Sequence, residues 1–168
     1  MKKSRFVLAG LALACVALLS VSLVGCSFAN SSSSSSSSTE VSDTGATNEG
    51  AIGKYYVSIG DARLGTDDNG NDVAFISVKF SNNDTTAVSF LNALNVTVSQ
   101  NQVEDPQATV SNDSTYNADN LNSEVQPEGS IILEYPVALQ DKTTPLDIEI
   151  TSSTASGATP VTETIVLS

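Results

Sequence analysis

The sequence predicts an all-β fold, an antiparallel β-sandwich, over residues 54–168. Three observations support this prediction. Short runs rich in β-branched and aromatic residues alternate apolar with polar positions, and none has the spacing of an amphipathic helix. Gly, Pro, Asn and Asp residues, which favour turns, separate these runs. Each expected strand has one apolar face, and two sheets bury such faces by packing them together.

The first three expected strands have apolar side chains at every second position. These positions are Tyr55, Val57 and Ile59, then Ala74, Ile76, Val78 and Phe80, then Leu94, Val96 and Val98. The third strand is expected to run from Ala87 to Ser99. Between the first two, residues 67–72 contain Asn-Gly, which accepts the positive φ of a tight hairpin turn.

The second half of the domain begins with a polar stretch. Residues 109–122 are expected to form a long connection that crosses between the sheets. A turn at Pro-Glu-Gly, residues 127–129, precedes a strand over residues 130–139. Pro136 cannot donate a backbone hydrogen bond, so this strand is expected at a sheet edge or with a bulge. The last two strands are expected at residues 146–150 and 161–167.

Six or seven short strands in a domain of this length fit a sandwich that is immunoglobulin-like in architecture. The chain has no Trp and no cysteine pair of the antibody type, so the likeness concerns architecture alone. A domain of this size buries most of its apolar surface without disulfides.

The N-terminus predicts a lipoprotein signal peptide over residues 1–25. A basic start is followed by an apolar run over residues 6–24, and the run ends in Leu-Val-Gly before Cys26. This is the pattern of a lipobox, and we expect cleavage before Cys26 and lipidation of its thiol. The alternative is an uncleaved transmembrane helix. Both interpretations place the rest of the chain outside the cell, on the extracytoplasmic face of the cell membrane.

Residues 26–53 are expected to be a disordered, Ser-rich tether. Ser31–Ser38 is an unbroken serine tract, and the residues after it lack apolar periodicity. Such composition behaves as a flexible linker. Whether the serines carry glycans is left open. The expected organisation is therefore signal peptide 1–25, tether 26–53 and sandwich domain 54–168.

Composition excludes several classes of activity. The chain has no His, and its two Cys residues lie in the signal peptide and at the lipidation site. Serine–histidine, cysteine–histidine and zinc-hydrolase sites are therefore excluded. The net charge of −12 becomes −15 when Lys2, Lys3 and Arg5 leave with the signal peptide. A surface this acidic disfavours nucleic acid and could attract cations or a basic partner. The alternative, which the even spread of the acids along the chain favours, is solubility outside the cell. We expect no catalytic residue and no cofactor.

Two weak sets of binding residues remain. Asp67, Asp68 and Asp72 offer carboxylates for Ca²⁺, but their spacing does not fit an EF-hand and the alternative is a solvated hairpin turn. Tyr56 and Tyr116 are candidate aromatic platforms for a glycan. The alternative for these tyrosines is a surface or core-capping position with a solvated hydroxyl.

Several segments resemble Gram-positive surface lipoproteins that carry domain of unknown function 5067. The resemblance covers residues 54–152 and rests on Tyr55–Ile59, Val78–Asn83, Ser89-Phe90, Gln126–Gly129 and Leu139–Asp141. It implies an immunoglobulin-like module on a lipid anchor, without an established activity. Most of the matching positions are structural, so the resemblance implies no catalytic residue.

The sequence leads to one main hypothesis and one alternative. The main hypothesis is a non-enzymatic interaction module at the bacterial cell surface, anchored to the membrane through Cys26 and contacting an envelope or extracellular protein. The alternative is a ligand-binding lipoprotein that captures a glycan or Ca²⁺. The identity of the partner and the oligomeric state are left open.

Overall fold

The computed structural model describes residues 47–168. The expected signal peptide, Cys26 and the tether as far as residue 46 lie outside the described residues. Within residues 47–168, no helix is long and apolar enough to cross a membrane.

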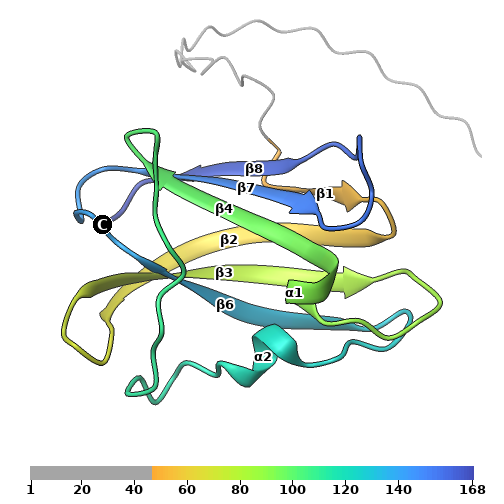
Figure 1. Ribbon diagram of the computed structural model, residues 1–168, viewed down its shortest axis with the longest axis horizontal. Coiled ribbons are helices and arrows are strands. Elements are labelled where there is room, and N and C mark those ends of the chain that lie inside the picture. Colours follow the sequence, from red (N-terminus) through yellow and green to blue (C-terminus); the bar gives the residue numbers. More distant parts are fainter. Residues whose placement is uncertain (1–46) are drawn as a thin grey trace, which may run out of the picture. The chain divides into compact units, whose positions relative to one another are not determined.

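The described residues form two four-stranded antiparallel sheets that pack face to face (Figure 1). Sheet A has the order β1-β2-β3-β6, with β1 Glu49–Ile52, β2 Tyr55–Thr66, β3 Asp72–Asn82 and β6 Ser130–Ala138. Sheet B has the order β5-β4-β7-β8, with β5 Val103–Glu104, β4 Leu94–Gln100, β7 Leu146–Ser152 and β8 Val161–Ile165. Two four-residue helices are α1 Phe90–Ala93 and α2 Asp119–Asn122.

The connections between strands are those of an immunoglobulin-like sandwich. Strands β2, β3 and β6 take the A, B and E positions, and β4, β7 and β8 take the C, F and G positions. The chain crosses between sheets after β3, after β5 and after β6. The predicted all-β, immunoglobulin-like sandwich is therefore confirmed.

The core lies between the two sheets, and the alternation pattern selected many of its residues. Ala74, Ile76, Val78 and Phe80 of β3 are each at most 1% exposed. Leu146, Ile148 and Ile150 of β7 alternate with exposed residues in the same way. The ring of Phe80 contacts Phe90 edge-on, with 5.8 Å between the ring centroids. The expected core faces of these two strands are confirmed.

The first half of strand β3 is also buried on its other face, which the alternation pattern does not predict. Val73 and Phe75 pack with Val110 in a second, smaller core on the outer side of sheet A. Val110 belongs to the connection between β5 and β6. This connection crosses from sheet B to sheet A, as predicted, and its first part folds back over the outer face of sheet A.

The edge position expected for Pro136 is confirmed, because β6 is the last strand of sheet A. The free edge of β6 is partly covered by the chain itself. The Ala138 N–H donates to the Pro106 carbonyl, and the Ala108 N–H donates to the Pro136 carbonyl, both at 3.0 Å. Residues 106–108 thus take the place beside the E strand that a D strand has in immunoglobulin domains.

The expected boundary at residue 54 differs from the structure. Strand β1 lies within the segment assigned to the tether, and it pairs with β2 from Glu49↔Ser58 to Ile52↔Tyr55. Ile52 is fully buried. A four-residue strand with a single large apolar side chain gives a weak sequence signal, and its stability comes from the ladder with β2.

The strand expected from Ala87 is wrong in its first half. Residues 90–93 form helix α1, which buries Phe90 and Ala93 at a spacing of three residues. This turn follows the isolated bridge between Val88 and Val125 and precedes β4. Alternation of apolar residues from Leu94 onward does describe β4, in which Leu94 and Val98 are buried.

The β2–β3 hairpin forms where it was predicted, but its turn is wider than the tight Asn-Gly turn. Within this turn, residues 67–72, only Gly70 has a positive φ, at 85°. The Asp67 N–H donates to the Asn71 carbonyl at 2.9 Å, and the Gly70 N–H donates to the Asp67 carbonyl at 3.1 Å. Two-residue turns occur instead at Gly53 and Lys54, between β1 and β2, and at Asn101 and Gln102, whose φ angles are 50° and 66°.

Gln100 is fully buried at the end of β4 and satisfies the backbone of the loop before β7. Its Nε2 donates to the carbonyls of Asp141 and Thr144, at 2.9 and 2.8 Å, and its Oε1 accepts from the Gln140 N–H at 2.8 Å. An apolar residue of similar size would leave these backbone groups without partners.

We therefore expect Gln100→Leu to lower the free energy of unfolding by about 3 kcal/mol, because buried backbone groups without partners are costly. Urea denaturation measures this loss. The matched control is Gln126→Leu at an exposed position, which should change stability by less than about 0.5 kcal/mol. Equal effects of the two substitutions would contradict the role of the buried amide.

Candidate functional site

A bulge in β2 places Arg63 on the outer face of sheet A. The register between β2 and β3 shifts between Ile59 and Ala62, because Ile59 pairs with Val78 and Ala62 with Ile76. One extra residue reverses which side chains face the core. Ala62 and Leu64 therefore pack against the main core, and Arg63 faces outward beside its partner Phe75.

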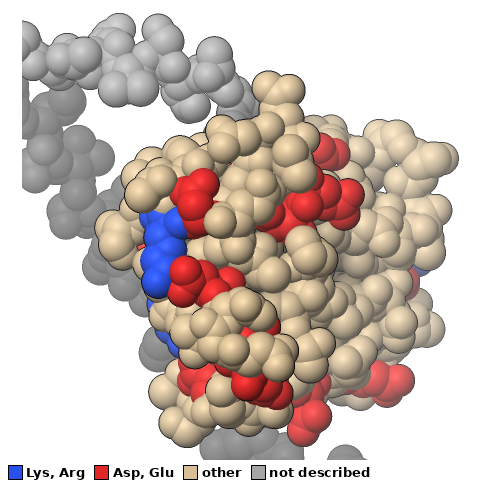
Figure 2. Space-filling model, turned by 60° about the vertical axis from the view of Figure 1, so that its left-hand side comes forward, with Lys and Arg blue, Asp and Glu red and all other residues tan. Residues whose placement is uncertain are grey.

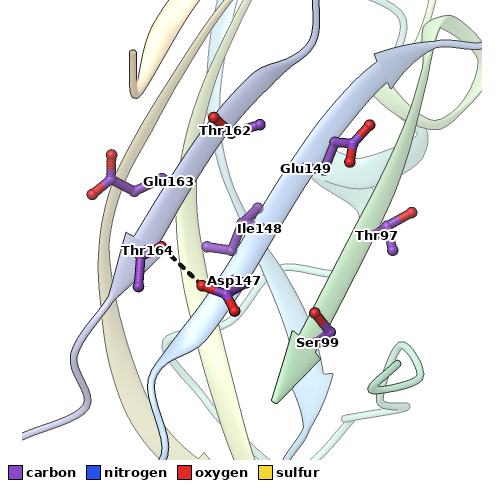
Figure 3. A pocket seen from close by; sticks show the side chains of 8 residues that line it. All are labelled: Thr97, Ser99, Asp147, Ile148, Glu149, Thr162, Glu163 and Thr164. Atoms are coloured by element: carbon purple, nitrogen blue, oxygen red, sulfur yellow. Dashed lines mark hydrogen bonds between the residues drawn. The ribbon is translucent and has the colours of Figure 1, made fainter. Parts of the chain in front are cut away.

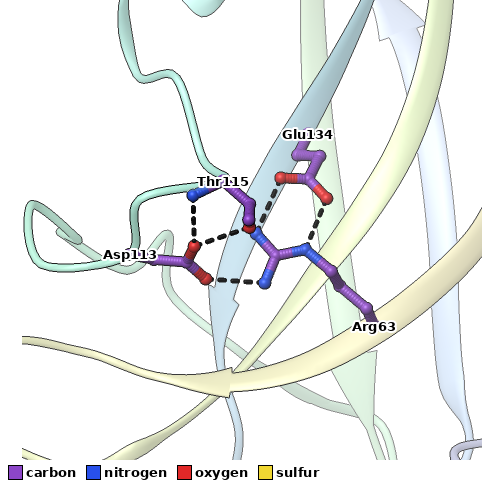
Figure 4. Close-up of polar contacts among 4 residues, drawn as sticks. All are labelled: Arg63, Asp113, Thr115 and Glu134. Carbon is purple, nitrogen blue, oxygen red and sulfur yellow. Dashed lines mark hydrogen bonds and ion pairs between the residues drawn. The ribbon is translucent and has the colours of Figure 1, made fainter.

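Arg63 joins three separate parts of the chain (Figure 4). Its Nε and Nη2 donate to the two carboxylate oxygens of Glu134 on β6, at 2.6 and 2.8 Å. Its Nη1 donates to Asp113 Oδ2 in the connection, at 2.6 Å. The guanidinium carbon lies 3.9 Å from the centre of the Phe75 ring. We call Arg63, Phe75, Asp113 and Glu134 the Arg63 cluster.

The electrostatics of the Arg63 cluster stabilise its charged forms. Hydrogen bonds from the Thr115 hydroxyl, from Arg63 and from the Thr115 N–H hold the pKa of Asp113 well below its usual range. The hydrogen bond with Glu134 is the main cause that raises the pKa of Arg63 above its ordinary value. The bidentate geometry and the stacking on Phe75 suit Arg and not Lys. The cluster fastens the connection to sheet A.

The connection and α1 line an open pocket beside this cluster, with a volume of about 350 Å³. We call it the Tyr116 pocket. Tyr116 is half-buried, because its ring packs against Phe75 with 5.2 Å between the ring centroids. Polar side chains that line the pocket are Gln107, Thr109 and Asn122, and the apolar ones include Leu91 and Leu121.

The outer face of sheet B has a different character. Two carboxylates of β7, Asp147 and Glu149, lie there between two rows of hydroxyl groups: Thr97 and Ser99 on β4, and Thr162 and Thr164 on β8 (Figure 3). They line a shallow depression of about 270 Å³. The Thr164 hydroxyl donates to Asp147 at 2.8 Å. We call these six residues the open face, because no described segment of the chain covers them.

The charge of the described domain is strongly negative. Residues 47–168 contain four basic and 17 acidic residues, a net charge of −13. Figure 2 shows acidic side chains spread over one side of the molecule. Lys54, Arg63 and Lys142 are held in ion pairs with carboxylates of the same domain. Asp147 and Glu149 have no such basic partner among the described residues.

The structure does not bring the three calcium candidates to one centre. Asp67 accepts hydrogen bonds from its own turn, at Asn69 and Asn71. Asp68 accepts from Ser111 and Asn112 in the connection, and Asp72 pairs with Lys142 at 2.7 Å. The side-chain hydrogen bond of Asn71 lowers the pKa of Asp67, and that of Ser111 lowers the pKa of Asp68. Within residues 47–168 no group of three or more metal-ligating side chains is present.

The two candidate tyrosines are also far apart. Tyr56 pairs with Ser81, six residues along β3 from Phe75, which corresponds to about 20 Å. Burial and the neighbouring Glu49 raise the pKa of Tyr56. Tyr116 lines a pocket. Sequence reasoning selected Tyr116 for its aromatic ring and missed Gln107, Thr109, Asn122 and the Arg63 cluster.

The lowered pKa of Asp113 predicts how the free energy of unfolding depends on pH. A carboxyl whose pKa is lower in the folded state stabilises the fold fully above its unfolded pKa of about 4. This contribution is lost as the pH falls through the folded value. We expect Asp113→Asn to lose less unfolding free energy than the wild type between about pH 4.5 and pH 1.5, measured by urea denaturation at stepped pH.

Asp119→Asn is the matched control for this measurement, because the Asp119 side chain is exposed on α2. It should follow the pH dependence of the wild type. Parallel curves for the wild type and Asp113→Asn would show that the Arg63 cluster does not stabilise ionised Asp113.

Comparison with known proteins places the chain in a family without assigning an activity. The model of the family described as Domain of unknown function (DUF5067) matches residues 30–152. No curated protein and no solved structure matches the chain. The match covers most of the sequence and includes β1 to β7, the Arg63 cluster and the Tyr116 pocket. The chain belongs to the DUF5067 family.

Proposed function

We propose that the protein is a non-enzymatic binding module, anchored by a lipid on Cys26 to the extracytoplasmic face of a Gram-positive cell membrane. The lipobox pattern before Cys26 supports the anchor. The serine-rich sequence that follows supports a flexible tether. In this proposal the tether ends at β1, because β1 is the first strand of the sandwich.

The roles of the carboxylates support a non-enzymatic function. Carboxyl groups with perturbed pKa values often mark active sites. In this domain the strongly perturbed ones cap loops: Asp113 accepts from Thr115 and Arg63, and Asp141 accepts from Thr143 and Thr144. Their lowered pKa values keep them ionised at neutral pH, so they are poor general acids and weak general bases. The absence of His from the sequence agrees with this interpretation.

The contact surface in this proposal is the open face. Asp147 and Glu149 lie two residues apart on the central strand β7, so both project from the same side of sheet B. Rows of hydroxyl groups flank them on β4 and β8. The partner proposed for this face is a basic segment of an envelope or extracellular protein, because carboxylates pair with Lys and Arg and hydroxyl groups add hydrogen bonds.

Calcium capture does not enter the proposal. Asp67, Asp68 and Asp72 already accept hydrogen bonds or pair with groups of this chain in three different places. Binding of one ion by all three would require the turn, the connection and the Lys142 pair to rearrange.

The anchor is tested by Cys26→Ala. We expect this variant to lose the lipid and to remain as uncleaved precursor or to be released from the membrane, because only the Cys26 thiol accepts the lipid. Cell fractionation and intact-mass analysis measure both outcomes. Cys15→Ala, within the signal peptide, is the control and should leave anchoring unchanged. An unmodified, uncleaved wild-type chain in membranes would contradict the lipid anchor.

The open face is tested with a fluorescent oligolysine peptide as the basic probe. We expect the double variant Asp147→Asn, Glu149→Gln to bind it about fivefold more weakly at low salt, a change of about 1 kcal/mol. Fluorescence anisotropy measures the affinity, and added salt should reduce it. The control is Asp119→Asn, Glu124→Gln, which removes the same charge elsewhere. Equal weakening by the two double variants would contradict a specific open face.

A further inference from the structure

The Tyr116 pocket has the features of a binding site for an uncharged ligand. None of the nine residues that line it carries a charge, although the domain around it is strongly acidic. A cationic ligand would find no carboxylate in the lining. An anionic ligand would be repelled by the net charge of the domain. These two facts favour a neutral ligand.

The polar groups of the pocket favour a ligand with several hydroxyl groups. Gln107, Thr109 and Asn122 are exposed, and their side chains make no hydrogen bond with other described residues. Each amide offers both donors and acceptors, as does the Thr hydroxyl. A purely apolar ligand would take these groups from water without replacing their hydrogen bonds, which costs free energy.

Aromatic and aliphatic side chains supply the other half of the lining. Tyr116 presents the surface that Phe75 does not cover, and Leu91 and Leu121 lie on the wall of the pocket. A sugar ring combines an apolar face of C–H groups with hydroxyl groups at its edge, so it matches both halves. A cavity of about 350 Å³ is at the lower end of the range for small-molecule sites, about 300 to 1,000 Å³.

The walls of the pocket are held in place before any ligand binds. Residues 106–108 are bonded to β6, Asp68 accepts from Ser111 and Asn112, and Arg63 binds Asp113. Leu121 and Val110, which belong to the lining, are 3% and 5% exposed. A preformed site does not spend binding free energy on ordering its loop.

We propose that the Tyr116 pocket binds a neutral sugar ring, with Tyr116 against its apolar face and with Gln107, Thr109 and Asn122 bonded to its hydroxyl groups. This is a second site, formed by the connection over sheet A. The open face of sheet B contributes no residue to it.

The proposal is tested by nuclear magnetic resonance titration of the domain with N-acetylglucosamine and with methyl glucoside. We expect saturable shifts confined to amides of residues 107–122 and of α1, with at least one of the two sugars. Glucuronic acid should bind more weakly because of its charge. The linear trimer of N-acetylglucosamine distinguishes the source of the ligand: tighter binding of the trimer indicates a glycan chain, and equal binding indicates a free monosaccharide.

Two asparagines on α2 provide a matched pair of variants. Asn122→Ala removes a polar group of the pocket and should weaken sugar binding about tenfold. Asn120→Ala, two positions earlier and outside the lining, should leave it unchanged. Tyr116→Leu should abolish binding, and thermal melting identifies any loss of folding in this variant.

Absence of saturable shifts with both neutral sugars up to about 20 mM, where even a millimolar Kd gives near saturation, would overturn the proposal. Shifts centred outside the pocket, or equal loss in Asn120→Ala and Asn122→Ala, would also overturn it. Oligolysine binding by the open face is independent of these results, because Asn122→Ala leaves that face intact.

Discussion

The placement of Arg63 is the constraint on which the connection over sheet A and the Tyr116 pocket depend. A single extra residue in β2 turns this side chain away from the core and sets it over Phe75. From there the guanidinium binds Glu134 on β6 and Asp113 in the connection. Gly65 is part of the same arrangement, because a Cβ at this position would lie 2.7 Å from the Phe75 ring. Without the bulge, Arg63 would face the core and the connection would lose its main ionic contact.

The sandwich itself was predictable because its strands obey simple alternation. In β3, β6 and β7, apolar residues at every second position pack in the main core. Burial of these side chains stabilises the fold, so the sequence itself shows the alternation. Predictions failed where another interaction decides the conformation. Strand β1 is stabilised by its ladder with β2. Helix α1 forms because a helical turn buries both Phe90 and Ala93. The bulge interrupts the alternation of apolar residues in β2, so the second half of this strand does not follow the pattern of the first.

The candidate sites were harder to predict for a different reason. A pocket formed by a long connection depends on which distant residues the fold brings together, and Gln107, Tyr116 and Asn122 have no spacing that marks them in advance. Tyr116 was identified only by its aromatic side chain. The acidic residues show the opposite problem, because a chain with 19 of them suggests many sites. The structure assigns Asp67, Asp68, Asp113 and Asp141 to the capping of loops.

The placement of the basic residues has a consequence for proteolysis of the folded domain. Proteases of the trypsin type cleave after Lys or Arg, and they require a local stretch of backbone to unfold into their active sites. Residues 47–168 offer them four such positions. Lys54, Arg63 and Lys142 are tied to carboxylates, while Arg63 and Lys79 lie within the ladders of β2 and β3. Cleavage at Arg63 or Lys79 therefore requires sheet A to open, whereas Lys54 and Lys142 lie in turns with exposed side chains.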